Sequence, residues 1–385
     1  MPQSVDVVMR FTDGTEIKAF DSFTLSERFL DPIDRFSCRL RPGKDHFARY
    51  RDLTRKGELI GLNVAGHPQA AMMIETVTTT VSPSAGLVID IQAVSTLKLL
   101  MEGYVSIADS KRLDADEPII DLVSNVADDF GFDEVQADDD IATLKSKTGK
   151  DTGAASKNGS PKQYKTAQTS GSETAYSFLN RVLSRNNMML RQHATGALIV
   201  TAPHYDGKAL YCVREAGPGG PKGDVLEGDI VEQDSNEGQF SFVETNGVPG
   251  DDDGEKETGA PTERVESSAI NSNRPPFRAT GFINYKPCYY KDDNAKDAKH
   301  AKNVSTLILG KAAERAYQIR CRVPALVSRD GIPWTVDTMC RVYIPTLGLD
   351  EEMWIAERVM KRDVSSGQMT ELTLSPKGYV VIGDT

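Results

Sequence analysis

The sequence lacks the signals that direct a chain into or across a membrane. No apolar run in its 385 residues approaches the roughly 18 residues that a membrane-spanning helix needs. The opening stretch MPQSVDVVMRF has no basic segment followed by an apolar one, so we expect no secretory signal and no membrane insertion. The net charge of −11 argues against a surface that recognises nucleic acid by sequence. We therefore expect a chain that is synthesised in a cytoplasm.

Clusters of metal-binding or disulfide-forming residues are also missing. The five cysteines and five histidines are scattered, and neither type forms a close pair such as C-x-x-C or H-x-x-x-H. The cysteines are Cys38, Cys212, Cys288, Cys321 and Cys340. We interpret them as reduced, mostly buried side chains, and we expect no metal site and no cofactor. The acidic run 251–253 has adjacent carboxylates without converging geometry, so we interpret it as a solvated charge run.

Recognisable catalytic motifs are absent as well. The sequence contains no G-x-S-x-G, no P-loop and no triad spacing, and its acids form no recognisable carboxylate pair of a glycan hydrolase. We therefore expect no enzymatic activity. Aromatic residues make up only 7% of the chain, with one cluster at Tyr285, Tyr289 and Tyr290. This scarcity disfavours, but leaves open, a monomeric carbohydrate-binding or adhesion module, which would need exposed aromatic platforms.

The N-terminal part of the chain is rich in β-strand patterns. Apolar residues of 5–11 alternate with residues of the opposite face, and the hairpin signal Asp13-Gly14 follows. The same alternation recurs in 35–40, in 59–64 and in 71–94, where a Ser/Pro/Gly turn separates two strands. Short strands at about ten-residue spacing are typical of a small antiparallel barrel or sandwich.

The period changes in the middle of the chain. Residues 116–132 have apolar side chains at helical spacing, with Pro118 near the start and Gly131 near the end, and they predict a helix. Residues 133–170 contain too few apolar side chains to form a core. We expect a long loop there, with early proteolytic cleavage within 143–170.

A helix–hairpin unit is predicted over 172–200. Ser170 and Glu173 have the spacing of a capping box, which predicts the start of a helix. The apolar stripe of this helix consists of Ala175, Phe178, Leu179, Val182 and Leu183. Asn186 ends the helix, and a turn with Gly196 then separates two strands. A stripe of this kind is a core face far more often than a cofactor site, so we interpret the unit as a scaffold.

An internal similarity connects two distant parts of the chain, 59–94 and 339–375. Each part has a strand, a turn, a strand with Met-x-Ile, a Ser/Gly turn and an alternating strand. The Met-x-Ile segments are 72–74 and 353–355, and the final strands align with a slip of one residue. We interpret the similarity as the duplication of a small β-barrel.

Two further segments lie between these parts. Residues 244–276 are acidic and rich in Gly and Pro, and we expect an exposed loop that proteases cleave within 246–275. Residues 294–316 predict a helix with one apolar side and a basic, solvated face.

The segments 57–95, 172–200 and 331–376 carry a resemblance to a known family. They resemble the baseplate hub proteins of contractile-tailed bacteriophages, the Mu-like hub and late-control tail-protein group, which is related to the hub part of type VI secretion spike proteins. The family's helix–hairpin pattern is matched by Phe178, Leu179, Val182, Asn186 and Gly196. Two features depart from the family. QAVS at 92–95 stands where the family often has a Gly-Arg-Asp-like step, and we interpret the acidic loop as lineage-specific.

The resemblance implies a mainly β fold with an α+β middle part, in which two similar small antiparallel β-barrels are joined by helix-containing domains. The domains would be 1–97 (first tube-like barrel), 98–210 (middle domain), 211–243 with 317–385 (second tube-like barrel) and 244–316 (inserted acidic loop and helix). The chain ends soon after the second barrel, so we expect no fused needle or lysozyme domain.

The function that the resemblance implies is structural. Family hubs are homotrimers, and three copies would form a ring with pseudo-six-fold symmetry that joins the six-fold tail tube to the three-fold central spike. The expected partners are two further copies, the tail tube protein, the central spike protein and baseplate wedge proteins, and the expected location is the virion. The candidate structural or interface residues are Phe178, Leu179, Val182, Asn186, Gly196, Ile74, Ile355 and Trp354.

Overall fold

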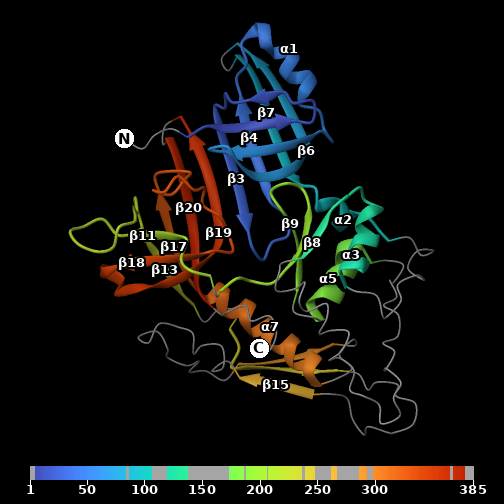
Figure 1. The fold of residues 1–385 in the computed structure, drawn as a ribbon, viewed down its shortest axis with the longest axis vertical. Helices are drawn as coiled ribbons and strands as arrows, with labels where there is room; N and C mark the ends of the chain where they lie inside the picture. Colours follow the sequence, from blue (N-terminus) through green and yellow to red (C-terminus); the bar gives the residue numbers. More distant parts are fainter. Residues whose placement is uncertain are drawn as a thin grey trace.

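The structure is a computed structural model of the 385-residue chain. The residues that it describes are 5–83, 86–105, 119–137, 173–185, 188–205, 207–235, 239–247, 262–266, 286–292, 298–364 and 367–377. Figure 1 shows four structural parts, which are two β-rich units, a helix–hairpin unit and a small sheet covered by one long helix. The prediction of a mainly β chain with helix-containing parts is confirmed.

The first β-unit contains the N-terminal strands and one helix. Its elements are β1 (Val7–Phe11), β2 (Glu16–Ile17), β3 (Ser22–Arg28), β4 (Arg35–Leu40), α1 (Lys44–Leu53), β5 (Leu59–Val64), β6 (His67–Ser82) and β7 (Gly86–Ser95). The predicted alternation is confirmed, since every second residue of β1 and β4 is buried. The predicted hairpin turn is also confirmed, because Gly14 has a φ of 83° and Asp13 Oδ1 accepts a hydrogen bond from Thr15 N at 2.8 Å. Helix α1 has no buried residue, which explains why the apolar pattern does not predict it.

The second β-unit is assembled from two separate segments of the chain. Its elements are β11 (Tyr211–Arg214), β12 (Asp224–Val225), β13 (Val231–Asp234), β17 (Tyr317–Val323), β18 (Met339–Ile344), the 3-10 helix Pro345–Leu347, β19 (Leu349–Asp363) and β20 (Gly367–Pro376). Strands β18, β19 and β20 pair antiparallel, as β5, β6 and β7 do in the first unit. Strand β11 is parallel to β18, whereas its counterpart β1 is antiparallel to β5.

The hairpins β6–β7 and β19–β20 have the same construction. Each contains one β-bulge, at Glu75 in β6 and at Ala356 in β19. Each turn ends at a glycine with positive φ, which is 72° at Gly86 and 73° at Gly367. Only glycine adopts this conformation without strain, so the two turns share a backbone requirement as well as a length.

The pairing registers place the two hairpins in residue-by-residue correspondence. Ile74 pairs with Ala93 as Ile355 pairs with Leu374, which is a constant shift of 281 residues from one hairpin to the other. The final strands β7 and β20 therefore correspond without an offset, and the slip of one residue is confined to the apolar alternation of β20. The bulges shift the alternation within β6 and β19, at equivalent positions of the two hairpins.

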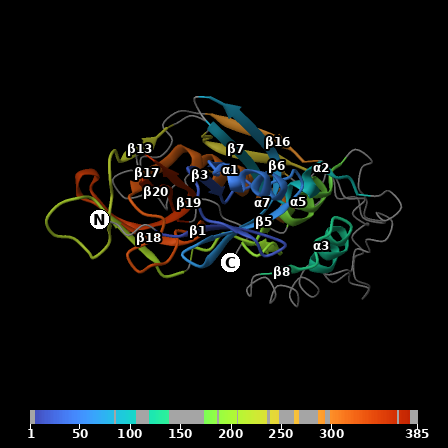
Figure 2. The same ribbon diagram turned by 90° about the horizontal axis from the view of Figure 1, so that it is seen from above.

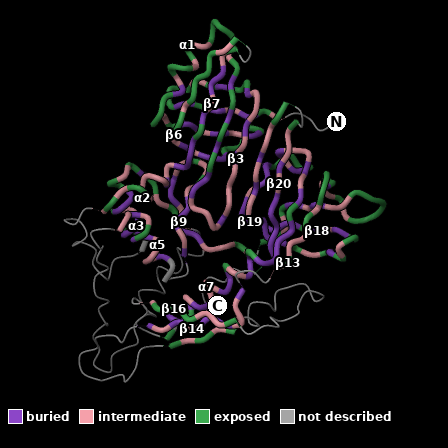
Figure 3. Tube along the Cα trace, turned by 180° about the vertical axis from the view of Figure 1, so that it is seen from behind, coloured by how far each residue is buried: buried purple, intermediate pink, exposed green. Residues whose placement is uncertain are grey.

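The two β-units share one continuous sheet, because β3 of the first unit pairs antiparallel with the C-terminal half of β19. Figure 1 shows β3 and β19 side by side between the two units. One apolar cluster runs through both units. Figure 3 shows its buried residues along the strands on both sides of this contact. The two units therefore fold against each other and not as independent bodies.

The helix–hairpin unit lies beside the first β-unit, and Figure 2 shows its helices at the end of the molecule opposite β18. Its elements are α2 (Lys98–Glu102), α3 (Ile119–Asp128), β8 (Val135–Ala137), α5 (Ala175–Arg185), β9 (Met189–Gln192) and β10 (Leu198–Thr201). The predicted helix and the predicted hairpin around Gly196 are confirmed as α5, β9 and β10. Their apolar side chains form a second core.

Two predictions about this unit need correction. The capping residue of α5 is Thr174, whose Oγ1 accepts a hydrogen bond from Ser177 N at 3.2 Å, while Glu173 forms an ion pair with Arg181 at 2.9 Å. Ser170 lies outside the described residues. The expected loop over 133–170 is wrong for 135–137, where β8 adds a parallel strand to β10. The rest of that segment, including 143–170, is not among the described residues.

The fourth part is a small sheet covered by a long helix. Its elements are β14 (Phe242–Asn246), β15 (Thr262–Glu266), β16 (Pro287–Lys291) and α7 (Ala298–Ala316). The helix confirms the prediction over 294–316. The expected loop over 244–276 is corrected in two places, because β14 extends to Asn246 and β15 pairs with it. The acidic run 251–253 lies outside the described residues.

Candidate functional site: an ionic junction and an open strand edge

Neither a metal-binding cluster nor a membrane-spanning helix occurs in the described part of the chain. Within these residues, no group of three His, Cys, Asp or Glu side chains lies close enough to hold a metal ion. No helix among them is both long and apolar enough to span a bilayer. The features that stand out instead are the contact between the two β-units and one strand edge that resembles it.

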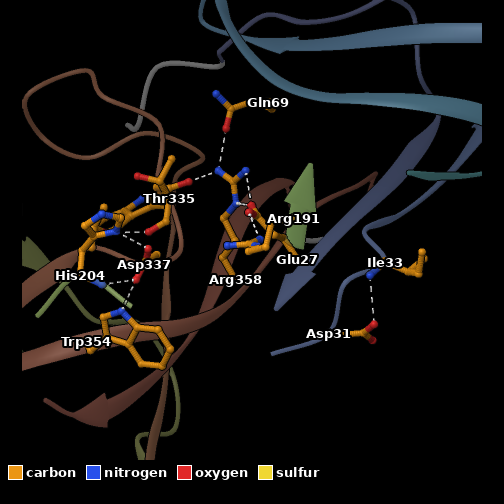
Figure 4. A network of polar contacts seen from close by, with 12 residues as sticks. Glu27, Asp31, Ile33, Gln69, Arg191, His204, Thr335, Asp337, Trp354 and Arg358 are labelled. Carbon is orange, nitrogen blue, oxygen red and sulfur yellow. Dashed lines mark hydrogen bonds and ion pairs between the residues drawn. The ribbon is translucent and has the colours of Figure 1, made fainter. Parts of the chain in front are cut away.

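A buried ion pair lies at the centre of the contact between the two β-units. Glu27 of β3 and Arg358 of β19 are directly opposite in the antiparallel register. The guanidinium of Arg358 donates through Nε and Nη2 to the same carboxylate oxygen of Glu27, at 2.8 and 2.7 Å (Figure 4). The side chain of Arg358 is only 2% exposed. A two-donor contact of this kind has a narrow range of acceptable geometries.

The helix–hairpin unit joins the same carboxylate. Arg191 of β9 donates to the other oxygen of Glu27 at 2.9 Å, and its guanidinium stacks over the ring of Phe29 at 4.7 Å. Arg358 also donates from Nη1 to Gln69 Oε1 at 2.6 Å and to the backbone oxygen of Trp334. We call Glu27, Arg191 and Arg358 the ionic junction. It connects both β-units with the helix–hairpin unit.

The charges of the junction act on two carboxyl groups. Burial would raise the pKa of Glu27, but the neighbouring charges of Arg358 and Arg191 hold it below its ordinary value. Burial and the charge of Glu27 together raise the pKa of Asp34 to about 8. Asp34 therefore stays protonated at neutral pH. Its Oδ1 has no hydrogen-bond partner among the described residues.

The β-bulge explains why an arginine lies in the interior here. Before the bulge the inward side chains of β19 include Met353 and Ile355, and after Ala356 the inward positions are Arg358 and Met360. The extra residue therefore reverses the alternation and turns Arg358 toward Glu27.

A second polar network holds the chain that enters the second β-unit. Asp337 adopts a positive φ of 60° and accepts hydrogen bonds from His204 N at 2.9 Å and from His204 Nδ1 at 2.6 Å. The same carboxylate accepts a bond from Trp354 Nε1 at 2.9 Å, so the indole of a fully buried side chain is satisfied (Figure 4). A cavity of about 300 Å³ lies between this network and the ionic junction.

The edge of β6 that corresponds to this contact is open. In β19, residues 357–362 pair with β20 on one edge and with β3 on the other. The corresponding residues 76–81 of β6 pair with β7, and within the described residues no strand lies on their other edge. All six are Thr or Val, none is charged, and Val81 is 69% exposed. A long, uncharged, β-branched edge is a template for pairing with another chain.

The structure places most of the predicted structural or interface residues in the interior. Phe178, Leu179, Ile74, Ile355 and Trp354 are buried, and Val182 is partly buried. Gly196 has a φ of 101° in the β9–β10 turn, where a Cβ would lie 3.3 Å from Ala71 Cβ. Asn186 lies outside the described residues. These positions support the parts from within, and their role in assembly stays a prediction.

Sequence reasoning did not find the ionic junction. The available signal is the position of Glu27, which shares an alternating stripe with Phe23, Leu25 and Phe29, all of them buried. A carboxylate on an apolar strand face needs a buried partner. Because that partner is 331 residues away, its identity could not be inferred.

The chain matches no protein-family model and no curated protein. Solved structures do match it. A tail protein from Neisseria meningitidis superposes with a TM-score of 0.73 at 14% identity, covering 98% of each chain. The 43 kDa tail protein of prophage MuSo2 from Shewanella oneidensis gives a TM-score of 0.70 at 14% identity, over 98% of this chain and 100% of that one. The chain has the fold of phage tail proteins.

A chain of a PdpA–VgrG complex shares this fold. A chain of the Francisella PdpA–VgrG complex in its half-lidded form superposes with a TM-score of 0.53 at 8% identity. The match covers 99% of this chain and 59% of that chain. The resemblance to phage hub proteins and to type VI secretion spike proteins, stated above from the sequence, is confirmed at the level of the fold.

Proposed function

We propose that this protein is the structural baseplate hub of a contractile phage tail. Three copies form a closed ring of six β-units with pseudo-six-fold symmetry, and the ring joins the six-fold tail tube to the three-fold central spike. The partners are the tube protein, the spike protein and baseplate wedge proteins, and the location is the virion. The tail-protein fold supports this assignment, and the protein acts through its geometry and not through catalysis.

The open edge of β6 is the observation that carries the proposal. The chain contains two similar hairpins, and among the described residues only the β19 hairpin has its outer edge covered, by β3 of the same chain. A ring of alternating first and second β-units has one contact within each copy, between β3 and β19, and one contact between copies. The contact between copies covers the β6 edge with a strand of the second β-unit of the next copy. The contacts within copies and between copies alternate around the ring, so the ring closes and neither hairpin keeps an exposed edge.

The corresponding strand of the next copy is β13. Within the first unit, β3 is the outermost strand and pairs with β4. Within the second unit, β13 is the outermost strand and pairs with β17. Thr24 of β3 pairs with Lys361 of β19, and their counterparts are Val231 of β13 and Thr80 of β6. The proposed contact therefore has a stated register, with Thr80 of one copy opposite Val231 of the next.

Two measurements test the proposal together. The solution mass should be three times 42.1 kDa. The double variant Thr80→Cys, Val231→Cys should form a disulfide between copies under mild oxidation, because directly opposed strand residues lie within disulfide reach. The shifted pair Thr80→Cys, Gln233→Cys is the matched control and should stay reduced. A stable monomer at micromolar concentration, with neither disulfide, would reject the ring.

A monomeric carbohydrate-binding or adhesion module is the second candidate. One observation favours it, which is the exposure of Tyr289 (60%) and Tyr290 (45%) on β16 at the edge of the small sheet. Tyr285 lies outside the described residues. A monomeric mass together with saccharide binding that is lost in Tyr289→Ala would support this candidate over the hub.

A further inference from the structure

The proposed ring raises a problem of selection, because two edges of the same construction compete for β3. The β19 edge over 357–362 and the β6 edge over 76–81 correspond residue by residue and follow equivalent bulges. If β3 of one copy paired with β6 of another, the first β-units of successive copies would join head to tail. The second β-units would then make no contact in the ring. Such a contact is heterologous and leads to open chains or to rings of the wrong composition.

We propose that the ionic junction is a specificity device that directs β3 to the edge of β19 and excludes it from the edge of β6. The inference rests on the proposed ring. It assigns a role to Glu27, Arg191 and Arg358 that differs from stabilising the fold. A buried ion pair contributes little net stability compared with apolar side chains of the same volume, but leaving one partner buried and unpaired is strongly unfavourable. This asymmetry suits selection between two partners.

The difference between the two edges is concentrated at one position. Arg358 of β19 corresponds to Val77 of β6, which is partly buried against the main core. On the β6 edge, Glu27 would therefore face a valine and lose the two-donor contact at 2.7 and 2.8 Å. Arg358 would in turn have no carboxylate opposite it. A loss of this size disfavours the wrong pairing on the order of 100-fold or more.

The other positions of β3 discriminate much less. Leu25 lies opposite Met360 on β19 and would face Thr79 on β6, which is an apolar contact of reduced size. Phe23 lies opposite Arg362 and would face Val81. Neither exchange leaves a charge without a partner. Arg28 lies opposite Glu357 and would face Thr76, but its side chain is 34% exposed and can be solvated, so the buried ionic junction dominates the selection.

The strand that is proposed for the β6 edge does not meet the same obstacle. By the register of β13, Asp234 takes the position that Glu27 has on β3. Asp234 is exposed in the single chain. Its carboxylate can keep its hydration beside Val77, whereas the carboxylate of Glu27 lies among the apolar side chains of β3.

The first test removes the device without leaving a lone charge. The triple variant Glu27→Leu, Arg191→Met, Arg358→Met should fold, and its assemblies should lose the single closed mass of the parent. The matched control is Glu173→Leu, Arg181→Met, which replaces an ion pair of α5 with a 2.9 Å contact away from the junction. The control should keep the mass of the parent.

A disulfide reports the wrong pairing directly. Ser26 lies opposite Val359, whose counterpart on β6 is Thr78. Within one chain β4 and β7 separate β3 from β6 by roughly 14 Å across the sheet. The two residues are also offset along the strands, because the row of Ser26 reaches β6 at Met73, so they are out of disulfide range. The pair Ser26→Cys, Thr78→Cys should therefore link copies only when β3 pairs with β6. We expect at least ~10-fold more of this link in the triple variant than in the parent, in line with the loss of a strong discrimination.

A second variant tests the same idea without touching the junction. Val77→Arg places an arginine on the β6 edge where Glu27 could meet it, and Val77→Gln is its uncharged control. We expect the Ser26–Thr78 link to increase with arginine and not with glutamine. If neither the triple variant nor Val77→Arg increases this link while the parent still forms the Thr80–Val231 link, the specificity role is rejected and the ring stands. If the parent is a monomer without that link, both proposals fail.

Discussion

The protonated carboxyl group of Asp34 predicts a specific dependence of stability on pH. Its pKa is raised to about 8 in the folded chain, against an ordinary value of 3.8. Between these pH values the folded state holds a proton that the unfolded state has released. The contribution of Asp34 to stability is therefore greatest below pH 4, decreases as the pH rises and becomes constant above pH 8. The largest possible slope is ~1.4 kcal/mol per pH unit for one proton.

The variant Asp34→Asn isolates this effect, because the amide resembles the protonated carboxyl group and does not titrate. Other groups titrate alike in both proteins, so the difference in unfolding free energy between variant and parent is the quantity to measure. From pH 5 to pH 7 this difference should shift in favour of the variant by up to ~3 kcal/mol. Urea unfolding at each pH, at one protein concentration, gives the two free energies.

The result that would refute this reasoning is a difference that does not change between pH 5 and pH 7. It would mean that Asp34 ionises in the folded chain much as it does in water. A shift in favour of the parent as the pH rises through 4, with no change between pH 5 and pH 7, would show that the carboxylate, and not the acid, is the form stabilised beside Arg191 and Arg358. Either outcome would also weaken the account of the ionic junction, in which Glu27 is the charged partner of both arginines and Asp34 is neutral.

Three further predictions concern single side chains. Arg358→Met leaves Glu27 with Arg191 as its only ionic partner among the described residues, and we expect a loss of ~3–5 kcal/mol that the additional change Glu27→Leu partly restores, measured by urea unfolding. Phe178→Ala removes a fully buried ring and should cost ~3–5 kcal/mol and block tail assembly in a complementation assay, whereas Asp252→Ala in the acidic run should change stability by no more than ~0.5 kcal/mol. The opposite pattern would place the function in the acidic run. Trp354→Ala should cost as much as Phe178→Ala, and near-ultraviolet circular dichroism should show the loss of its packing against Phe29 at 5.1 Å.

Local patterns of the sequence determined much of the secondary structure. Alternation predicts β1, β4 and β5, and helical spacing predicts α5, because one face of each element packs against a core. The same patterns failed where an element has no buried face, as in α1, or where a capping group competes with its neighbours, as at Thr174. The internal similarity was also visible, since two hairpins with the same turns and bulges need similar residues at the same spacing.

Only the tertiary structure decided what the two hairpins do. Residues 76–81 and 357–362 are both strands of equal length, and the sequence gives no reason to expect one edge covered and the other open. The bulge at Ala356 reverses the alternation that a period-two analysis assumes, so it moves Arg358 from an expected surface position into the interior. Its partner Glu27 lies 331 residues away, and a contact across that distance depends on how β3 packs beside β19 and not on any local preference of either strand.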